Sequence, residues 1–95
     1  MLTGIRLKQK LAPTVKKMRA AGNMSRLAVL YMLLREPLSL QTLMHRAQMS
    51  PGLAAHHLKV LRAAGWVKKS KFGKLVEYSI NEDAVKDALV FFRKP

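Results

Sequence analysis

The sequence contains no cysteine and few acidic residues, and both scarcities limit what the protein can do. Without cysteine the chain has no disulfides, thiolate metal sites or cysteine nucleophiles. Asp and Glu total 5 against 18 Lys and Arg, which gives a net charge of +13. Such an excess indicates a polyanionic partner, either nucleic acid or an anionic membrane, although basic surfaces also occur on proteins that bind neither.

Long apolar runs are also missing. The longest, residues 27–34, lies between Arg26 and Arg35 and is far shorter than the roughly 20 residues needed to cross a bilayer. The N-terminus is basic but lacks the apolar core of a secretory signal. A transit peptide shares the absence of acidic residues from residues 1–35, but serine is not enriched there. We therefore expect a cytoplasmic protein with no membrane partner.

Apolar residues at helical spacing predict two helices in the first third of the chain. Residues 5–22 carry a stripe of helical period, and Pro13 should kink this segment or start a second helix. A helix over residues 24–35, capped by Asn23 or Ser25, is apolar on every face. Such a helix must be covered by the N-terminal helix, by a second subunit, or by both. The first stripe consists of Leu7, Leu11, Val15 and Met18.

Two short helices joined by a tight turn follow. Pro37 ends the preceding helix and Ser39 caps the first short one, while Ser50 caps the second, residues 51–64, with Pro51 at its first position. Gly65 should end it in the left-handed conformation. The expected inward residues are Leu40, Leu43, Met44 and Ala47 in the first helix, and Leu53, His57, Leu58 and Leu61 in the second.

After Gly65 the apolar period becomes two, which predicts a β-hairpin. The stretches "WVKKSK" and "KLVEYSI" flank a turn at Phe72-Gly73, and Asn81 caps a last helix with Glu82 and Asp83 in its first turn. The expected inward residues are Val76, Tyr78 and Ile80 in the hairpin, and Val85, Ala88, Leu89 and Phe92 in the helix.

The predicted fold class is mainly α with a small β-hairpin, a winged helix–turn–helix. We expect a single domain over residues 1–95. It comprises a basic N-terminal helical segment (1–22), a winged-helix core (24–80) and a C-terminal helix (82–93).

The stretch "SPGLAAHHLKVLRAAGWVKKSKFGKLVEYSI" resembles the ArsR-type winged-helix regulators. The pattern is a helix led by serine, "HLKVL", an "AAG" stop followed by an aromatic residue and Val, and a basic "FGK" wing that ends in "EYSI". About residues 24–80 fit, and MarR-like relatives share part of the pattern. The resemblance implies a regulator that binds double-stranded DNA and forms a homodimer through its terminal helices.

Neither metal site of that family transfers to this chain. Many members bind metals through cysteines near the third helix, where this chain has "LSLQTLMH". Others use Asp and His pairs on the last helix, which here carries Glu82, Asp83 and Asp87 without a histidine. The neighbours His56 and His57 point about 100° apart on a helix, so they cannot readily chelate one ion. We expect no metal and no cofactor, and the sequence identifies no small-molecule effector.

The helix over residues 51–64 should lie in the DNA major groove. Only His56, Lys59 and Arg62 have side chains that reach base edges, whereas Ala54 and Ala55 could contact a thymine methyl. Direct base readout is therefore sparse, and most affinity should come from phosphate contacts of the wing. Phe72 either wedges into the minor groove or packs on its own hairpin. The candidate DNA-binding residues are Ser50, Gly52, Ala55, His56, Lys59, Arg62, Lys68, Lys69, Lys71, Phe72 and Lys74.

The predicted function is a dimeric transcriptional repressor with helix 51–64 in the major groove and wing 66–80 on the DNA backbone. Two alternatives remain at this stage. One is a nucleoid or architectural protein of low specificity, and the other is a winged helix that binds protein or RNA. The basic residues of the first helix have two interpretations. They either reach flanking phosphates or keep a dimer soluble. The sequence has no carboxylate pair, nucleophile elbow or phosphate loop, so we do not expect an enzyme.

Overall fold

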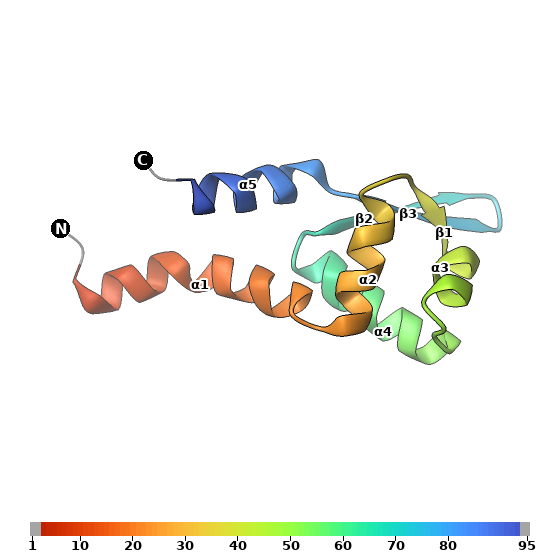
Figure 1. Cartoon of the computed structure of the whole chain (residues 1–95), viewed down its shortest axis with the longest axis horizontal. Helices are drawn as coiled ribbons and strands as arrows, with labels where there is room; N and C mark the ends of the chain where they lie inside the picture. The colour runs from red at the N-terminus through yellow and green to blue at the C-terminus, as the bar shows by residue number, and fades with distance from the viewer. Residues whose placement is uncertain (1–2, 94–95) are drawn as a thin grey trace.

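The computed structural model describes residues 3–93 and arranges them in an elongated body of 51 × 23 × 22 Å (Figure 1). One lobe contains the central helices and the sheet, and the two terminal helices extend from it in the same direction. The elements are α1 (Gly4–Ala21), α2 (Met24–Leu33), β1 (Leu38–Ser39), α3 (Leu40–Arg46), α4 (Pro51–Ala63), β2 (Val67–Phe72), β3 (Leu75–Ile80) and α5 (Glu82–Phe92).

Local hydrogen bonds set the helix boundaries, as the sequence predicts. Asn23, Ser39, Ser50 and Asn81 are all N-caps, and the Ser39 hydroxyl accepts from the backbone N–H of Thr42 at 3.1 Å. At the other end of α4, Gly65 has a φ of +85°. Its N–H donates to the Arg62 carbonyl at 3.0 Å, and the Trp66 N–H donates to the Leu61 carbonyl at 2.9 Å. These two bonds form a Schellman motif, which orients the chain into the wing.

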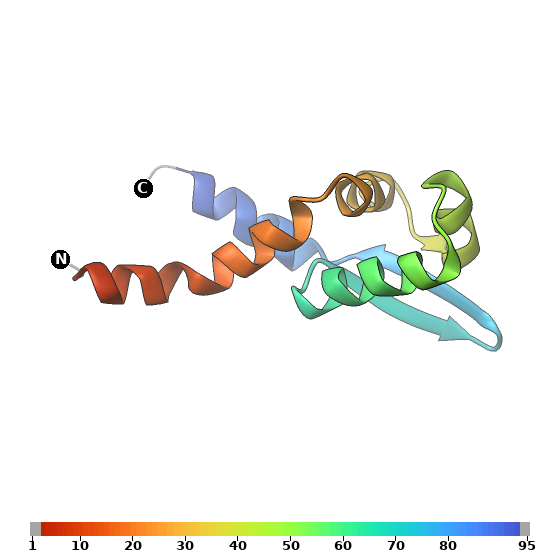
Figure 2. The same cartoon turned by 90° about the horizontal axis from the view of Figure 1, so that it is seen from below.

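Helix α1 continues through Pro13, so the expectation of a second helix starting there is wrong. Figure 2 shows the helix bending near its middle, in agreement with the expected kink. Proline removes the hydrogen bond to the carbonyl of Gln9, but both residues are exposed. Water can therefore satisfy the freed carbonyl, and the helix bends without ending.

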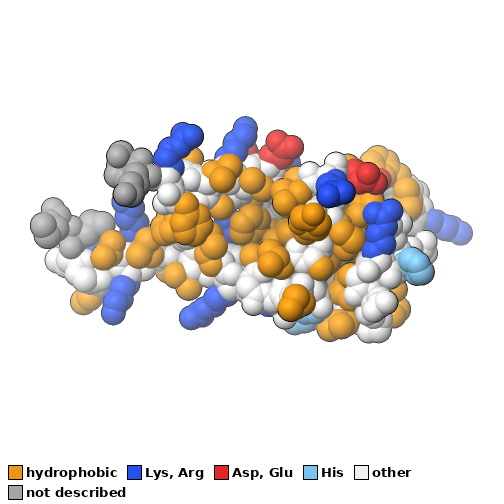
Figure 3. Space-filling view, viewed as in Figure 1, with side chains coloured by type: hydrophobic (Ala, Val, Ile, Leu, Met, Phe, Trp, Pro, Cys, Tyr) orange, Lys and Arg blue, Asp and Glu red, His pale blue; other side chains and the backbone are white. Residues whose placement is uncertain are grey.

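The terminal helices leave much of their apolar surface uncovered. Only Ala84 of α5 is buried, whereas Leu89 is 67% exposed and Phe92 is 70% exposed. The predicted stripe of α5 thus packs only along its first turns, because the helix then leaves the core and runs beside α1. Figure 3 shows this apolar surface continuing across the molecule toward the central lobe.

The outer face of α2 is also exposed, as its all-round apolar sequence allows. Met24 is 87% exposed and Tyr31 is 62% exposed. Within residues 3–93, α1 does not cover this face, and a second subunit remains as the predicted cover. None of the described helices is long and apolar enough to cross a membrane.

The three strands form one antiparallel sheet in the order β1-β3-β2. The predicted hairpin is present, with Val67 opposite Ile80 at its base and Phe72 opposite Leu75 at its tip. Gly73, with a φ of +61°, is the first residue of the tight turn between these strands. Strand β1 was not expected, since two residues give no periodicity, and Leu38 pairs with Tyr78 of the distant β3.

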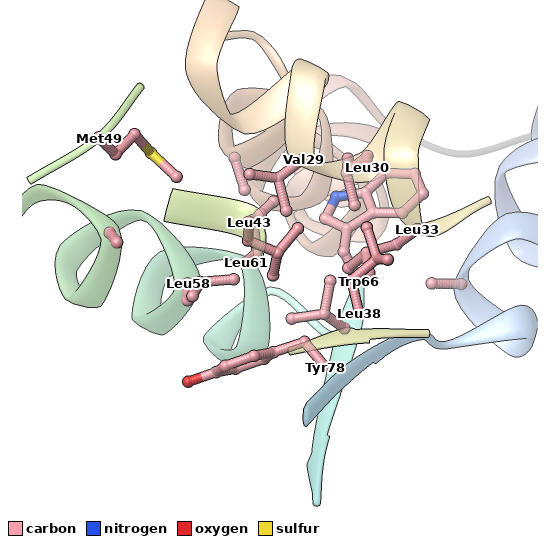
Figure 4. Packing of buried hydrophobic residues seen from close by; sticks show 14 residues of the cluster. Val29, Leu30, Leu33, Leu38, Leu43, Met49, Leu58, Leu61, Trp66 and Tyr78 are labelled. Carbon is pink, nitrogen blue, oxygen red and sulfur yellow. The ribbon is translucent and has the colours of Figure 1, made fainter. Parts of the chain in front are cut away.

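The core lies between α2, α3, α4 and the sheet (Figure 4). Leu33, Leu43, Leu58, Leu61 and Val29 are its largest fully buried side chains. All five come from the central helices, so packing fixes how α4 is rotated relative to the rest of the lobe.

Contacts between Trp66 and Lys17 attach α1 to this core. The Trp66 Nε1–H donates to the backbone carbonyl of Lys17 at 2.8 Å, and the Lys17 ammonium lies 5.9 Å from the centre of the Trp66 ring. The same ammonium pairs with Asp87 of α5 at 3.7 Å. Residues 17 and 66 thus join the two terminal helices to the start of the wing.

Candidate nucleic-acid interface

One face of α4 is free of the core along its whole length. Its exposed residues recur at steps of three and four, as one face of a helix requires. The opposite face, with Ala54, His57, Leu58 and Leu61, is buried. The sequence-predicted site residues on the exposed face are Gly52, Ala55, His56, Lys59 and Arg62.

The buried face of α4 is rotated by one position at its start from the prediction. Leu53 is 44% exposed and Ala54 is fully buried, so the expectations of an inward Leu53 and of an Ala54 contact to thymine are wrong. Because the core contacts centre on Ala54, Leu58 and Leu61, Leu53 lies at the edge of the helix. Leu53 is thus an exposed apolar side chain beside the candidate site that the sequence reading missed.

Four basic residues converge on an open groove between α4 and β2. Lys59 and Arg62 contribute from the helix, and Lys68 and Lys69 from the strand. The groove has a volume of about 450 Å³, and the other two residues that line it are Ala63 and Val67. With no carboxylate among its lining residues, this groove has a positive potential that favours an anion.

Strand register divides the wing lysines between two faces of the sheet. Lys69 lies opposite Tyr78 and Lys71 opposite Val76, so these two lysines share the sheet face that carries the core residues. Lys68 lies opposite Ser79 and therefore on the other face. The carboxylate of Glu77 also belongs to that other face, because its partner is Ser70. The face of Lys69 and Lys71 carries no acidic residue of the wing.

The wing tip is exposed and partly apolar. Phe72 is 62% exposed and Leu75, its cross-strand partner, is 48% exposed, so Phe72 does not pack down on its hairpin. Lys74 lies in the turn and lines a small hollow shared with Ser39 and Gln41 at the start of α3. Gln41 is exposed and was missed by the sequence reading, although the Ser39 cap places it in the first turn of α3.

Ser50 caps α4 at the edge of this surface. Its hydroxyl accepts from the backbone N–H of Leu53 at 3.3 Å, which orients the first turn of the helix. All eleven predicted site residues are exposed, and α4 and the wing bring them to one lobe. We call the surface that these eleven residues form the α4–wing surface.

His57 points away from this surface into the protein. Its side chain is 7% exposed, and its Nδ1 lies 3.3 Å from the Nη1 of Arg26 in α2. Burial lowers the pKa of His57, and the nearby positive charges of Arg26 and His56 lower it further. A neutral imidazole whose Nδ1 accepts from the guanidinium fits this geometry. The predicted inward position is confirmed, and the hydrogen-bond partner, Arg26, comes from another helix.

The imidazole of His56 is exposed on the outer face, and its ring centre is 5.6 Å from that of His57 with a tilt of 51°. Within residues 3–93, no three His, Cys, Asp or Glu side chains are grouped so that they could hold a metal ion.

Comparison with known proteins places this architecture in a family. The sequence profile of the "bacterial regulatory protein, arsR family" matches residues 23–69. The structure of HlyU from Vibrio cholerae is similar with a TM-score of 0.77 and 32% identity, over 86% of this chain and 89% of that chain. Among curated proteins, the sequence search found no match.

Two further structures share the fold. A fragment of a Mycobacterium bovis protein is described as a homodimeric winged helix-turn-helix DNA-binding domain of a possible ArsR-family regulator. It has a TM-score of 0.77 and 25% identity, over 94% of this chain and 84% of that chain. NolR from Sinorhizobium fredii has a TM-score of 0.80 and 21% identity, over 96% of this chain and 91% of that chain. With its winged helix–turn–helix and its basic α4–wing surface, the chain belongs to the ArsR family of bacterial regulatory proteins and is a DNA-binding transcriptional regulator.

Proposed function

We propose that the protein is a cytoplasmic, non-enzymatic, dimeric repressor that inserts α4 into the major groove and grips the DNA backbone with its wing. The exposed face of α4, beside a groove lined by Lys59, Arg62, Lys68 and Lys69, carries this proposal. Base contacts come from His56, Lys59 and Arg62, and phosphate contacts come from the wing lysines. Phe72 contacts the minor groove from the exposed wing tip.

Dimerisation supplies the second half-site. The apolar surface of α1 and α5 needs a cover, and the similar M. bovis fragment is described as homodimeric. Two copies related by a two-fold axis place their recognition helices one DNA turn apart, about 34–36 Å. The expected operator is therefore a palindrome.

Selection from a random duplex library, followed by binding measurements, tests the proposal. Reversing the charge at Lys59, Lys69 and Lys71 to Glu should weaken binding to the selected duplex by about 100-fold or more, because three phosphate or base contacts become repulsive. Fluorescence anisotropy at several salt concentrations gives both the affinity and the number of ionic contacts.

A second triple variant controls for net charge. Lys10, Arg35 and Lys86 are exposed and lie outside the α4–wing surface, so reversing them changes net charge equally. This control should retain most of the affinity and specificity. Light scattering verifies that both variants remain dimers. Equal losses of affinity in two dimeric variants would reject the proposed interface, since only the total charge would then matter.

One observation favours a second candidate function, an architectural DNA-binding protein. The first turns of α4 present Gly52 and Ala55, which have no polar side chain to read a base. Such a protein would bind selected and random duplexes alike and lose affinity steeply with salt. The selection experiment separates the two candidates, because only the repressor enriches a palindrome.

A further inference from the structure

A larger groove lies between α4 and α1 and adjoins the α4–β2 groove at Ala63. Its volume is about 650 Å³, and it is open to the surface. The groove uses none of the side chains assigned to DNA contact above. Its walls combine an apolar floor of Ala12, Val15, Ala20, Val60, Ala63 and Ala64 with the basic side chains of Lys8, Lys16, Arg19 and Arg26.

Arg26 is a half-buried cation of this groove without a counterion. Its Nε–H donates to the Ala20 carbonyl at 2.7 Å, and its Nη1 meets the His57 imidazole at 3.3 Å. Both partners are neutral groups, and the part of the chain that the structure describes gives Arg26 no ion pair. A charge that is partly removed from water and lacks an opposite charge is unfavourable. An anion in the groove would relieve this cost.

The lining favours one kind of occupant over two others. A DNA backbone would use the basic side chains but leave the apolar floor in contact with water. A second copy of the chain would cover the floor, but with 5 acidic residues against 18 basic ones it offers few carboxylates to pair with the four cations. A small molecule with an apolar body and an anionic head matches both parts of the lining, and the volume is typical of small-molecule pockets.

We propose that the α1–α4 groove binds a free amphipathic organic anion, such as an aliphatic carboxylate. Its head lies among Lys16, Arg19 and Arg26, and its chain lies on the alanine and valine floor. The walls come from the recognition helix and from a helix of the apolar dimer face, so an occupant that favours one α1–α4 arrangement changes DNA affinity. This regulatory part rests on the proposed function, whereas the binding site itself does not.

Decanoate is a suitable probe, and the single tryptophan reports on it, because Trp66 bonds to α1 beside the groove. Titration of the protein with decanoate should give a saturable fluorescence change and a saturable calorimetric signal. The decyltrimethylammonium cation, which lacks the anionic head, and inorganic phosphate, which lacks the chain, should give neither. Equal responses to decanoate and to the cationic amphiphile would contradict the site.

Two variants test the two halves of the lining. Arg19→Gln removes an exposed cation, and Ala12→Phe fills the floor from an exposed position of α1. Each should weaken decanoate binding by about tenfold, as the loss of one charge-assisted contact or of the apolar surface predicts. Lys10→Gln, on α1 but outside the groove, is the matched control, and circular dichroism with urea unfolding verifies that each variant folds.

The outcomes separate the site from the proposed function. Wild-type affinity for decanoate in both groove variants would overturn the site. Binding to anionic phospholipid vesicles without binding to free decanoate would also overturn it, in favour of a membrane surface. Decanoate should shift the affinity for the selected duplex in the wild type and not in Ala12→Phe. If decanoate binds but no duplex is selected, the proposed function fails and the site stands.

Discussion

At the scale of single residues, His57 connects the recognition helix to the rest of the protein. The imidazole accepts from Arg26 of α2, and the same guanidinium donates to the carbonyl of Ala20 in α1. Burial is the first cause of its lowered pKa, followed by the charges of Arg26 and His56. The folded protein thus holds His57 neutral at a pH where the unfolded chain begins to bind a proton.

This shift predicts that acid destabilises the fold. The folded-state pKa lies below the ordinary value of 6.5, so the contribution to stability is complete above pH 6.5 and is lost as pH falls through the folded-state pKa. His57→Gln keeps an acceptor for Arg26 but cannot titrate. Its free energy of unfolding, measured in urea, should fall less between pH 7.5 and pH 5.5 than that of the wild type.

His45→Gln is the matched control, because His45 is exposed on α3. This variant should keep the pH dependence of the wild type. If the unfolding free energies of His57→Gln and the wild type change in parallel with pH, another group causes the acid sensitivity.

Residue-level prediction succeeds where a residue acts through its neighbours in the sequence. The caps at Ser39, Ser50 and Asn81 and the left-handed Gly65 depend on residues within a few positions, so the sequence is enough to identify them. Leu53 is different, since its environment depends on how α4 rotates against the core. An apolar stripe locates that rotation only to within one residue.

At the scale of elements, the sequence does not reveal which distant segments pair with one another. Strand β1 exists because Leu38 and Ser39 meet Tyr78 and Glu77, about forty residues away in the chain. The division of the wing lysines between two faces also follows from register. The basic residues of α4 and β2 predict a basic surface between these two elements. They do not predict which of those residues line the α4–β2 groove.

The junction between α1 and the core depends on Trp66, which gives a prediction at this scale. Trp66→Phe keeps a large aromatic side chain but removes the 2.8 Å hydrogen bond to the Lys17 carbonyl. The free energy of unfolding should decrease by about 1 kcal/mol, the usual loss for one hydrogen bond. Limited proteolysis should also cut α1 faster, because its attachment is weaker.

Tyr31→Phe is the control for that substitution. It also removes one hydrogen-bonding group from an aromatic ring, but Tyr31 is 62% exposed and its hydroxyl meets Arg35 only at 3.4 Å. We expect unchanged proteolysis of α1 and a change in unfolding free energy within about 0.5 kcal/mol. Equal effects of the two variants would argue against a specific role of Trp66.

At the scale of the whole molecule, most of the exposed large apolar side chains lie on the terminal helices and on α2, away from the α4–wing surface. The α4–wing surface contains the groove cations. By contrast, α1, α5 and the outer face of α2 expose leucine, phenylalanine and methionine side chains (Figure 3). An apolar surface of this extent is unusual on a monomer and typical of an interface. Composition alone indicates a polyanionic partner, but it does not show that most of the exposed apolar side chains lie away from the α4–wing surface.

This separation predicts that charge placed on α5 disrupts the dimer. Leu89 is 67% exposed, and a two-fold axis would place two copies of any new charge in one interface. The wild type should elute with twice the 10.7 kDa chain mass in light scattering, and Leu89→Glu should elute as a monomer at the same concentration. Its affinity for the palindrome should fall by about 100-fold or more, because the two half-sites are no longer bound together. Leu75→Glu, at an exposed leucine of the wing, should remain a dimer; dissociation of this variant with an intact Leu89→Glu dimer would place the interface on the wing.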